Sequence, residues 1–139
     1  MKKIITDQND RVGKWVCERT GGIFNDKVAT CIGLEYEGNL IAGVIFDHYN
    51  HKSIAMHVAA EGKRWMNKEY LWYCFHYPFN ELKIDKILGF VEENNTDARR
   101  FDEHLGFKLE TKIIDACKGG DLLVYTMTRE QCRFLKDRT

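Results

Sequence analysis

The segment that most constrains the fold covers residues 53–80, where a strand, a short basic loop and a helix follow one another. Residues 53–59 alternate larger apolar side chains with alanine and histidine, the two-residue period of a β-strand. Asn67 is a favourable N-cap for the helix that follows. The apolar side of this helix is predicted to carry Tyr70, Leu71, Cys74 and Tyr77. A strand that runs through a loop into a helix is therefore the core of the predicted architecture.

The loop between them reads Glu61-Gly62-Lys63-Arg64-Trp65. The first N–H groups of a helix lack internal partners, and the helix dipole adds positive potential there. Together with the two cations, this favours an anion-binding site. The same residues also suit an ordinary strand-to-helix connection with a solvated basic loop, because one glycine and two cations are a weak motif. Both interpretations remain open on local sequence.

Composition predicts one folded domain over residues 1–139, since 44% of the residues are hydrophobic and low-complexity runs are absent. The net charge of zero argues against a nucleic acid or an anionic membrane surface as partner. The sequence contains no apolar run long enough for a signal peptide or a bilayer span. Five cysteines without a CxxC motif indicate reduced thiols, so we expect a cytoplasmic protein.

The remaining elements follow from periodicity and turn residues. A strand is predicted at 2–6, and a helix capped by Asp7 at 8–19, ended by Gly21-Gly22. Strands at 28–36 and 40–48 flank a tight turn and continue into 53–59 as a meander. After Pro78 ends the central helix, we expect a strand at 86–92, a helix at 96–105 closed by Gly106, strands at 107–116 and 121–128, and a helical turn within 129–138. This order predicts an α/β (α+β) fold, a mixed sheet with helices on both faces.

One pattern points to a family: Asn95-x-x-Ala98, followed by Leu105-Gly106-Phe107. With the element order, it resembles the GNAT N-acetyltransferase superfamily over nearly the whole chain. The segments 79–95 and 119–135 look most like small GNATs often encoded by phages. The resemblance implies a mostly antiparallel sheet of six to seven strands, with a V-shaped splay between the fourth strand, 53–59, and the fifth, 86–92.

The resemblance also implies acetyl-CoA as co-substrate and direct attack by a primary amine, which could be a protein N-terminus, a lysine or a small molecule. Backbone N–H groups near Val58 would polarise the thioester carbonyl, and the loop 62–67 would hold the pyrophosphate. A basic patch that includes Arg99 would meet the adenosine 3′-phosphate. The cofactor-binding residues expected on this basis are His57, Val58, Gly62, Lys63, Arg64, Trp65, Met66, Asn67, Asn95, Arg99 and Phe101.

The sequence departs from the family pattern at three positions. The phosphate loop of the family usually reads Q/R-x-x-G-x-G/A, whereas residues 62–66 keep only Gly62 and larger residues fill the slot of the second glycine. A tyrosine that protonates the departing thiolate in many members corresponds here to Asp102, and an ionised aspartate cannot donate a proton. A glutamate on the fifth strand that serves some members as base corresponds to Phe90. Neither catalytic role is therefore carried over.

Two residues remain as candidate catalytic bases, His57 on the central strand and Glu61 just after it. Histidine suits the removal of a proton from an amine near neutral pH. The structural alternatives are a hydrogen-bonded strand histidine and a solvated glutamate. Asp47 and His48 end the third strand near the expected acceptor side, where turn residues are the alternative. The spacing of His48, His51 and His57 does not match a common zinc signature, so we predict no metal site.

Two other classes of function compete with the enzyme. A GNAT-fold module could bind acyl-CoA or a protein without turnover, which the changed loop and the missing tyrosine motivate. A small binder of nucleic acid or of a host factor could use the basic loop, although zero net charge weighs against it. We expect an amine acceptor, possibly on a protein, as partner, no membrane, and a monomer or homodimer.

Overall fold

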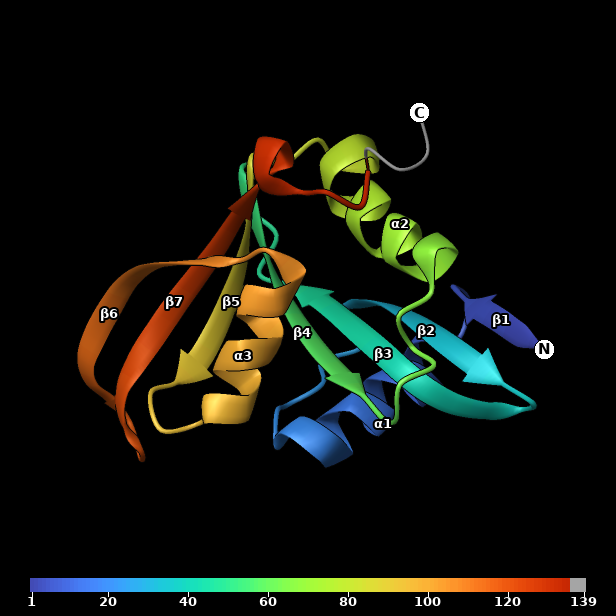
Figure 1. The fold of residues 1–139 in the computed structure, drawn as a ribbon, viewed down its shortest axis with the longest axis horizontal. Coiled ribbons are helices and arrows are strands. Elements are labelled where there is room, and N and C mark those ends of the chain that lie inside the picture. Colours follow the sequence, from blue (N-terminus) through green and yellow to red (C-terminus); the bar gives the residue numbers. More distant parts are fainter. Residues whose placement is uncertain (136–139) are drawn as a thin grey trace.

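The computed structural model describes residues 1–135 and contains one seven-stranded sheet in the order β1-β2-β3-β4-β5-β7-β6 (Figure 1). The strands are β1 (Lys2–Ile5), β2 (Thr30–Tyr36), β3 (Asn39–Asp47), β4 (Ser53–Ala60), β5 (Lys86–Glu92), β6 (Lys108–Cys117) and β7 (Gly120–Thr128). The helices are α1 (Asn9–Thr20), α2 (Lys68–His76) and α3 (Thr96–Leu105). The predicted mixed sheet and element order are confirmed.

The pairing of β4 with β5 sets the shape of the sheet. It is the parallel pair in an otherwise antiparallel sheet, and it extends only over Ser53↔Lys86, Ile54↔Ile87 and Ala55↔Leu88. Beyond Ala55 the two strands separate, while β4 stays paired to β3 and β5 stays paired to β7 along their lengths. The two halves of the sheet therefore diverge, as the predicted V-shaped splay requires.

Helices cover both faces of the sheet. Helix α1 lies on one face, where Val12 and Val16 pack in a cluster with Cys31 and Ile45. Gly43 of β3 allows this close approach, because a Cβ there would lie 2.7 Å from a methyl group of Val16. Helices α2 and α3 lie on the other face and bury the larger apolar cluster (Figure 1). Because side chains along β4 alternate between the two faces of the sheet, this strand contributes residues to both apolar clusters.

Local signals explain most of the helix ends. The Asn67 side chain accepts a hydrogen bond from the Tyr70 N–H at 2.9 Å, as a helix N-cap does. Gly21 and Gly106 close α1 and α3 in the left-handed conformation. The predicted cap at Asp7 is wrong: α1 begins at Asn9, after Gln8, and no side chain caps it.

Two further segments differ from expectation. Helix α2 ends at His76, near the predicted position. Pro78 does not end the helical conformation, because the chain continues as a π-helical turn over Tyr77–Glu81. The C-terminal helical turn is a short 3-10 segment, Arg129–Gln131. Residues 136–138 of that prediction lie outside the described residues. Within residues 1–135, no helix is long and apolar enough to cross a membrane.

Candidate functional site

A cleft with a volume of about 710 Å³ opens where β4 and β5 separate. Its walls come from the second half of each strand, from the C-terminal end of α1 and from the first two turns of α3. Its lining includes His57 and Val58 on β4, Gly89 and Phe90 on β5, and Asn95, Ala98, Phe101 and Asp102 at α3. The structure thus brings together four of the predicted site residues, namely His57, Val58, Asn95 and Phe101.

The backbone of β4 presents hydrogen-bonding groups to this cleft. The Glu61 N–H donates to the Ile41 carbonyl of β3, and the Lys52 carbonyl accepts from Asp85 and Lys86 on the β5 side. Because successive residues of a strand alternate between its two neighbours, the N–H groups of Met56, Val58 and Ala60 face away from β3. Pairing with β5 has ended by then, so these groups face the cleft.

His57 is linked to the end of β3. Its Nε2 lies 2.8 Å from Oδ1 of Asp47, and the same oxygen lies 2.8 Å from Nδ1 of His48. The Asp47 and His57 side chains are mostly buried, whereas His48 is 70% exposed. His48 has a φ of 57°, a left-handed conformation that is uncommon for residues other than glycine. Asp47 thus fixes the orientation of His57 and leaves Nδ1 of that ring for another partner.

A second, mostly apolar hollow of about 670 Å³ lies on the other side of this hydrogen bond. It is lined by Ile23, Asn25, Val28, Asp47, His48 and Tyr49. Ile23 and Val28 are unusually exposed for their type, at 91% and 64%. Asp47 lines this hollow and His57 lines the cleft. The Asp47–His57 pair therefore separates two adjoining spaces.

Asp102, at the position of the tyrosine in the family pattern, also lines the cleft. Its carboxylate packs against β5, where a Cβ on Gly89 would lie 3.0 Å from Oδ2. Loss of solvent around this half-buried group, with a contribution from the neighbouring Glu103 charge, raises the pKa of Asp102 to about 7. A fraction of Asp102 is therefore protonated at neutral pH. The expectation that it is fully ionised is corrected.

The predicted phosphate loop lies beyond the lining of the cleft. Gly62 has a φ of 70°, so it has the left-handed turn for which glycine is suited. Trp65 is buried and stacks on Phe101 of α3, with ring centroids 4.9 Å apart. The Arg64 guanidinium lies over the Tyr36 ring at 4.7 Å. Lys63 and Met66 are exposed, and Asn67 is engaged as the cap of α2.

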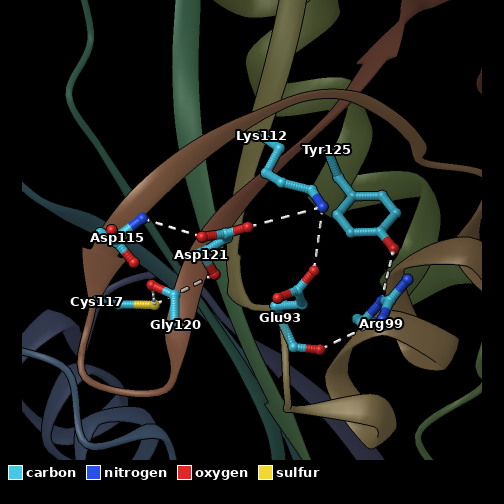
Figure 2. Close-up of polar contacts among 8 residues, drawn as sticks. All are labelled: Glu93, Arg99, Lys112, Asp115, Cys117, Gly120, Asp121 and Tyr125. Carbon is cyan, nitrogen blue, oxygen red and sulfur yellow. Dashed lines mark hydrogen bonds and ion pairs between the residues drawn. The ribbon is translucent and has the colours of Figure 1, made fainter.

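Asn95 and Arg99 are held by contacts of their own. The Asn95 side-chain oxygen accepts from the Ala98 N–H and caps α3. The Arg99 guanidinium donates to the Glu93 carbonyl and the Tyr125 hydroxyl, on the side of α3 that faces the β6–β7 hairpin (Figure 2). Lys112 joins this network through Glu93. Arg99 therefore ties α3 to the hairpin.

Glu61, the second predicted base, is not brought to the cleft. Its carboxylate accepts a hydrogen bond from Nε of Arg19 at 2.8 Å, and it lines a shallow groove beside α1. Of the two candidates, only His57 lines the cleft.

The three histidines considered as metal ligands, His48, His51 and His57, do not come together. His51 is hydrogen-bonded elsewhere, with its Nδ1 lying 2.9 Å from the Tyr49 hydroxyl oxygen. Within residues 1–135, the donors of Asp47, His48 and His57 lie within 4.8 Å of one another, a spacing that could also suit an ion. Each of the two histidines is hydrogen-bonded to Oδ1 of Asp47.

Solved structures with a similar fold include acetyltransferases. Mutant forms of the spermidine/spermine N-acetyltransferase SpeG from Vibrio cholerae match with a TM-score of 0.73, 15% identity and 100% coverage of both chains. The same enzyme in complex with manganese ions matches with a TM-score of 0.71 at 16% identity, over 99% of this chain and 97% of that one. This chain has the GNAT fold.

A probable acetyltransferase supports the assignment of the GNAT fold, with a TM-score of 0.67, 14% identity and 94% coverage of both chains. No family model and no curated protein matches this sequence. At such low identities, the shared feature is the fold, and activity needs a separate argument.

Sequence reasoning did not connect Asp47 with His57 or assign a role to Asp102. The Asp47–His57 contact arises from strand pairing, since Asp47 pairs with Ala55 and Ile45 pairs with His57. A hairpin register between β3 and β4 would have revealed it. The state of Asp102 depends on burial by α3 and β5, for which the GNAT fold must be known first.

Proposed function

We propose that this protein is an N-acetyltransferase that moves an acetyl group from acetyl-CoA to a primary amine. The observation that carries the proposal is the end of β4–β5 pairing at Ala55, which leaves β4 amides facing a cleft. The pantetheine arm of CoA is extended and contains amides, so it can continue the hydrogen bonding of the sheet between the strands. The acetyl-CoA-dependent reaction is an inference from this geometry and from the fold.

The reaction requires polarisation of the thioester carbonyl. A backbone N–H fixed in the sheet does not have to reorganise as negative charge develops on that oxygen. Val58 offers such a group beside His57. We assign it the oxyanion contact.

The reaction also requires an uncharged amine. His57 lies one residue from the proposed oxyanion contact and is oriented by Asp47. Its remaining ring nitrogen can take a proton from the amine, directly or through a water molecule. The amine nitrogen then attacks the acetyl carbon, and the carbon–sulfur bond breaks as CoA leaves. His57 is the proposed base, and Glu61 has no part in this proposal.

The diphosphate is proposed to lie against loop 62–67, at the N-terminal end of α2. The helix dipole and the loop N–H groups would favour an anion there. Lys63 is exposed in this loop, whereas Arg64 is stacked on Tyr36. Lys63→Ala should therefore weaken CoA binding more than Arg64→Ala. Equal affinities of both variants and the wild type would place the diphosphate elsewhere.

The apolar hollow supports an acceptor whose amine is attached to an apolar group. Ile23, Val28 and Tyr49 offer it apolar surface within reach of the Asp47–His57 pair. A polyamine such as spermidine, named for SpeG, carries further cations that need carboxylates. Within this hollow the carboxylate is Asp47, which already bonds two histidines. An apolar N-terminal residue or an apolar small amine fits better.

Two measurements test the proposal. Acetyl-CoA should raise the melting temperature, because a ligand that binds only the folded chain stabilises it. CoA release should then depend on an added amine, assayed with apolar amines, peptides with apolar N-terminal residues and polyamines. Absence of a thermal shift at saturating acetyl-CoA would rule out the enzyme.

The competing function is a GNAT-fold module that binds acyl-CoA without turnover. The observation that favours it is the loop 62–67, which keeps a single glycine of the family pattern and buries Trp65. A thermal shift without CoA release for any amine would select this alternative.

A further inference from the structure

Three side chains of the kinds that ligate metals meet where β3 ends. Oδ1 of Asp47 lies 2.8 Å from Nε2 of His57 and 2.8 Å from Nδ1 of His48. Within residues 1–135, these three donors lie within 4.8 Å of one another. Two imidazoles and one carboxylate form a ligand set that suits divalent transition metals. The acetyl transfer proposed above uses the Asp47–His57 bond and gives the His48 imidazole no role.

The backbone brings the three donors to one point. Strand pairing places His57 opposite Ile45, two residues before Asp47. Neighbouring residues of a strand point to opposite faces, so His48 would turn away from Asp47 if β3 continued. The chain leaves β3 here, and His48 has a φ of 57°, so its Nδ1 reaches the same oxygen as His57. The His48 ring also lies against Phe90 of β5, with ring centroids 6.4 Å apart.

The charge and the space at this cluster suit a cation. In the described part of the chain, no lysine or arginine pairs with the Asp47 carboxylate, whose ion-pair partners are the two histidines. Asp47 is mostly buried, whereas His48 is exposed, so an ion can reach the carboxylate from solvent. Both residues line the apolar hollow of about 670 Å³, which leaves room for water ligands.

We propose that Asp47, His48 and His57 bind a zinc ion, with water completing the coordination. Zinc holds nitrogen and oxygen ligands at about 2.0–2.2 Å, so two ligands of a tetrahedral site lie about 3.4 Å apart. The present nitrogen–oxygen separations are 2.8 Å. Each therefore has to widen by roughly half an ångström, and the ion takes the place of the hydrogen atoms that now lie between these atoms.

Zinc would change the tautomer of His57. A neutral imidazole carries one N–H, and a carboxylate only accepts, so in the metal-free chain Nε2–H donates to Asp47 and Nδ1 carries the lone pair. Zinc needs the lone pair of Nε2, and the hydrogen then moves through water to Nδ1. That nitrogen can no longer take a proton from an amine. Zinc is therefore a reversible inhibitor of acetyl transfer, a consequence that rests on the proposed function.

Cobalt(II), which replaces zinc in such sites, tests the ligand set by its visible absorption. Co²⁺ added to the full chain with reduced thiols should give the bands of a four- or five-coordinate site, and Zn²⁺ should abolish them. His48→Gln should weaken the zinc affinity roughly 100-fold, the share of one ligand in a typical site. His51→Gln, the matched histidine that bonds to Tyr49, should keep the wild-type affinity.

Two results of this titration would overturn the site. One is equal zinc affinity in the wild type and His48→Gln. The other is a near-ultraviolet charge-transfer band that persists with the visible bands in His48→Gln, since that band would place the ion on a cysteine thiolate.

The His57 tautomer gives a readout that needs no acceptor. Nitrogen NMR of the chain labelled with ¹⁵N-histidine should show the His57 hydrogen on Nε2 without zinc and on Nδ1 with zinc. The same nitrogen carrying the hydrogen in both states would overturn the site, whether or not amines are acetylated.

Inhibition is measured against the zinc-free rate of the same variant. Zinc should inhibit the wild type and His51→Gln at equal concentrations, and His48→Gln at roughly 100-fold higher concentration. Equal sensitivity of His48→Gln would overturn inhibition through this site. A chain that acetylates no amine would contradict the proposed function, while the cobalt and NMR spectra would still decide the zinc site.

Discussion

Nε2 of His57 and Oδ1 of Asp47 lie 2.8 Å apart, joining the cleft between β4 and β5 to the apolar hollow at the end of β3. The bond leaves one ring nitrogen of His57 for a reacting group. A carboxylate in this position orients the imidazole. Under the proposed function, this pair is the base at the boundary between the proposed cofactor cleft and the proposed acceptor hollow.

Removal of the base should reduce turnover without loss of cofactor binding. His57→Gln is expected to lower kcat roughly 10²–10⁴-fold, and Asp47→Asn by a smaller factor, because the imidazole remains but loses its orientation. Thermal shift with acetyl-CoA should be close to wild type in both. His104→Gln, an exposed histidine on α3, is the matched control. Wild-type turnover of His57→Gln at every pH would exclude His57 as base.

Asp102 should make stability fall as the pH rises. Its pKa is about 7 in the folded chain, against 3.8 for an aspartate in water. Between these values the folded state binds more protons than the unfolded state, so the free energy of unfolding decreases with rising pH. The slope contributed by one such group is at most about 1.4 kcal/mol per pH unit.

Urea unfolding at several pH values measures this slope. Asp102→Asn should remove it and should be more stable than the wild type above neutral pH, where the charged carboxylate is costly. Asp85→Asn, which changes an exposed carboxylate paired with Lys52, should keep the wild-type dependence. Identical slopes in the wild type and Asp102→Asn would mean that the folded and unfolded chains hold this proton equally.

The strands and helices were largely predictable because their signals are local. Alternation marked β4, Asn67 marked the start of α2, and Gly106 marked the end of α3. The start of α1 was predicted to within one residue, but its cap at Asp7 was not: the Asn9 side chain at the first helical position accepts a hydrogen bond from the Cys31 backbone N–H on β2. This contact spans a sequence separation that local reasoning does not reach.

The site was predictable only in part, for the same reason. His57, Val58 and Asn95 were identified by position within a recognisable order of elements, and they do line the cleft. The contacts that orient these side chains, such as the Asp47–His57 hydrogen bond, depend on strand register and burial. Arg99 and Arg64 illustrate the limit: both are cations in basic segments, yet one bonds to Tyr125 and the other stacks on Tyr36.

Trp65 should stabilise the fold, in addition to lying in the proposed phosphate-binding loop. It is buried and stacks on Phe101, so it connects the start of α2 to α3. Trp65→Ala is expected to cost about 3–5 kcal/mol of unfolding free energy, whereas Trp65→Phe should cost much less. Urea unfolding of both variants measures the difference. A loss below about 1 kcal/mol for Trp65→Ala would show that the stack contributes little.

The last prediction concerns the choice of acceptor. If the hollow holds the apolar part of the amine, then Ile23→Ser and Val28→Ser should raise KM for apolar amines. A lost apolar contact of this size corresponds to roughly 10-fold or more in kcat/KM. Small amines such as methylamine do not reach these side chains, so their turnover should be unaffected. Both residues are exposed in the free chain, which makes a large change in stability improbable on physical grounds.

The measurement is kcat/KM for a matched series of primary amines of increasing apolar size, at saturating acetyl-CoA. The wild type should gain activity along the series, and the serine variants should lose that gain. Leu109→Ser, an exposed apolar residue on β6 away from the hollow, serves as control. A series in which polyamines are preferred, with no effect of Ile23→Ser, would move the acceptor to the Arg19–Glu61 side of α1, where carboxylates line the surface.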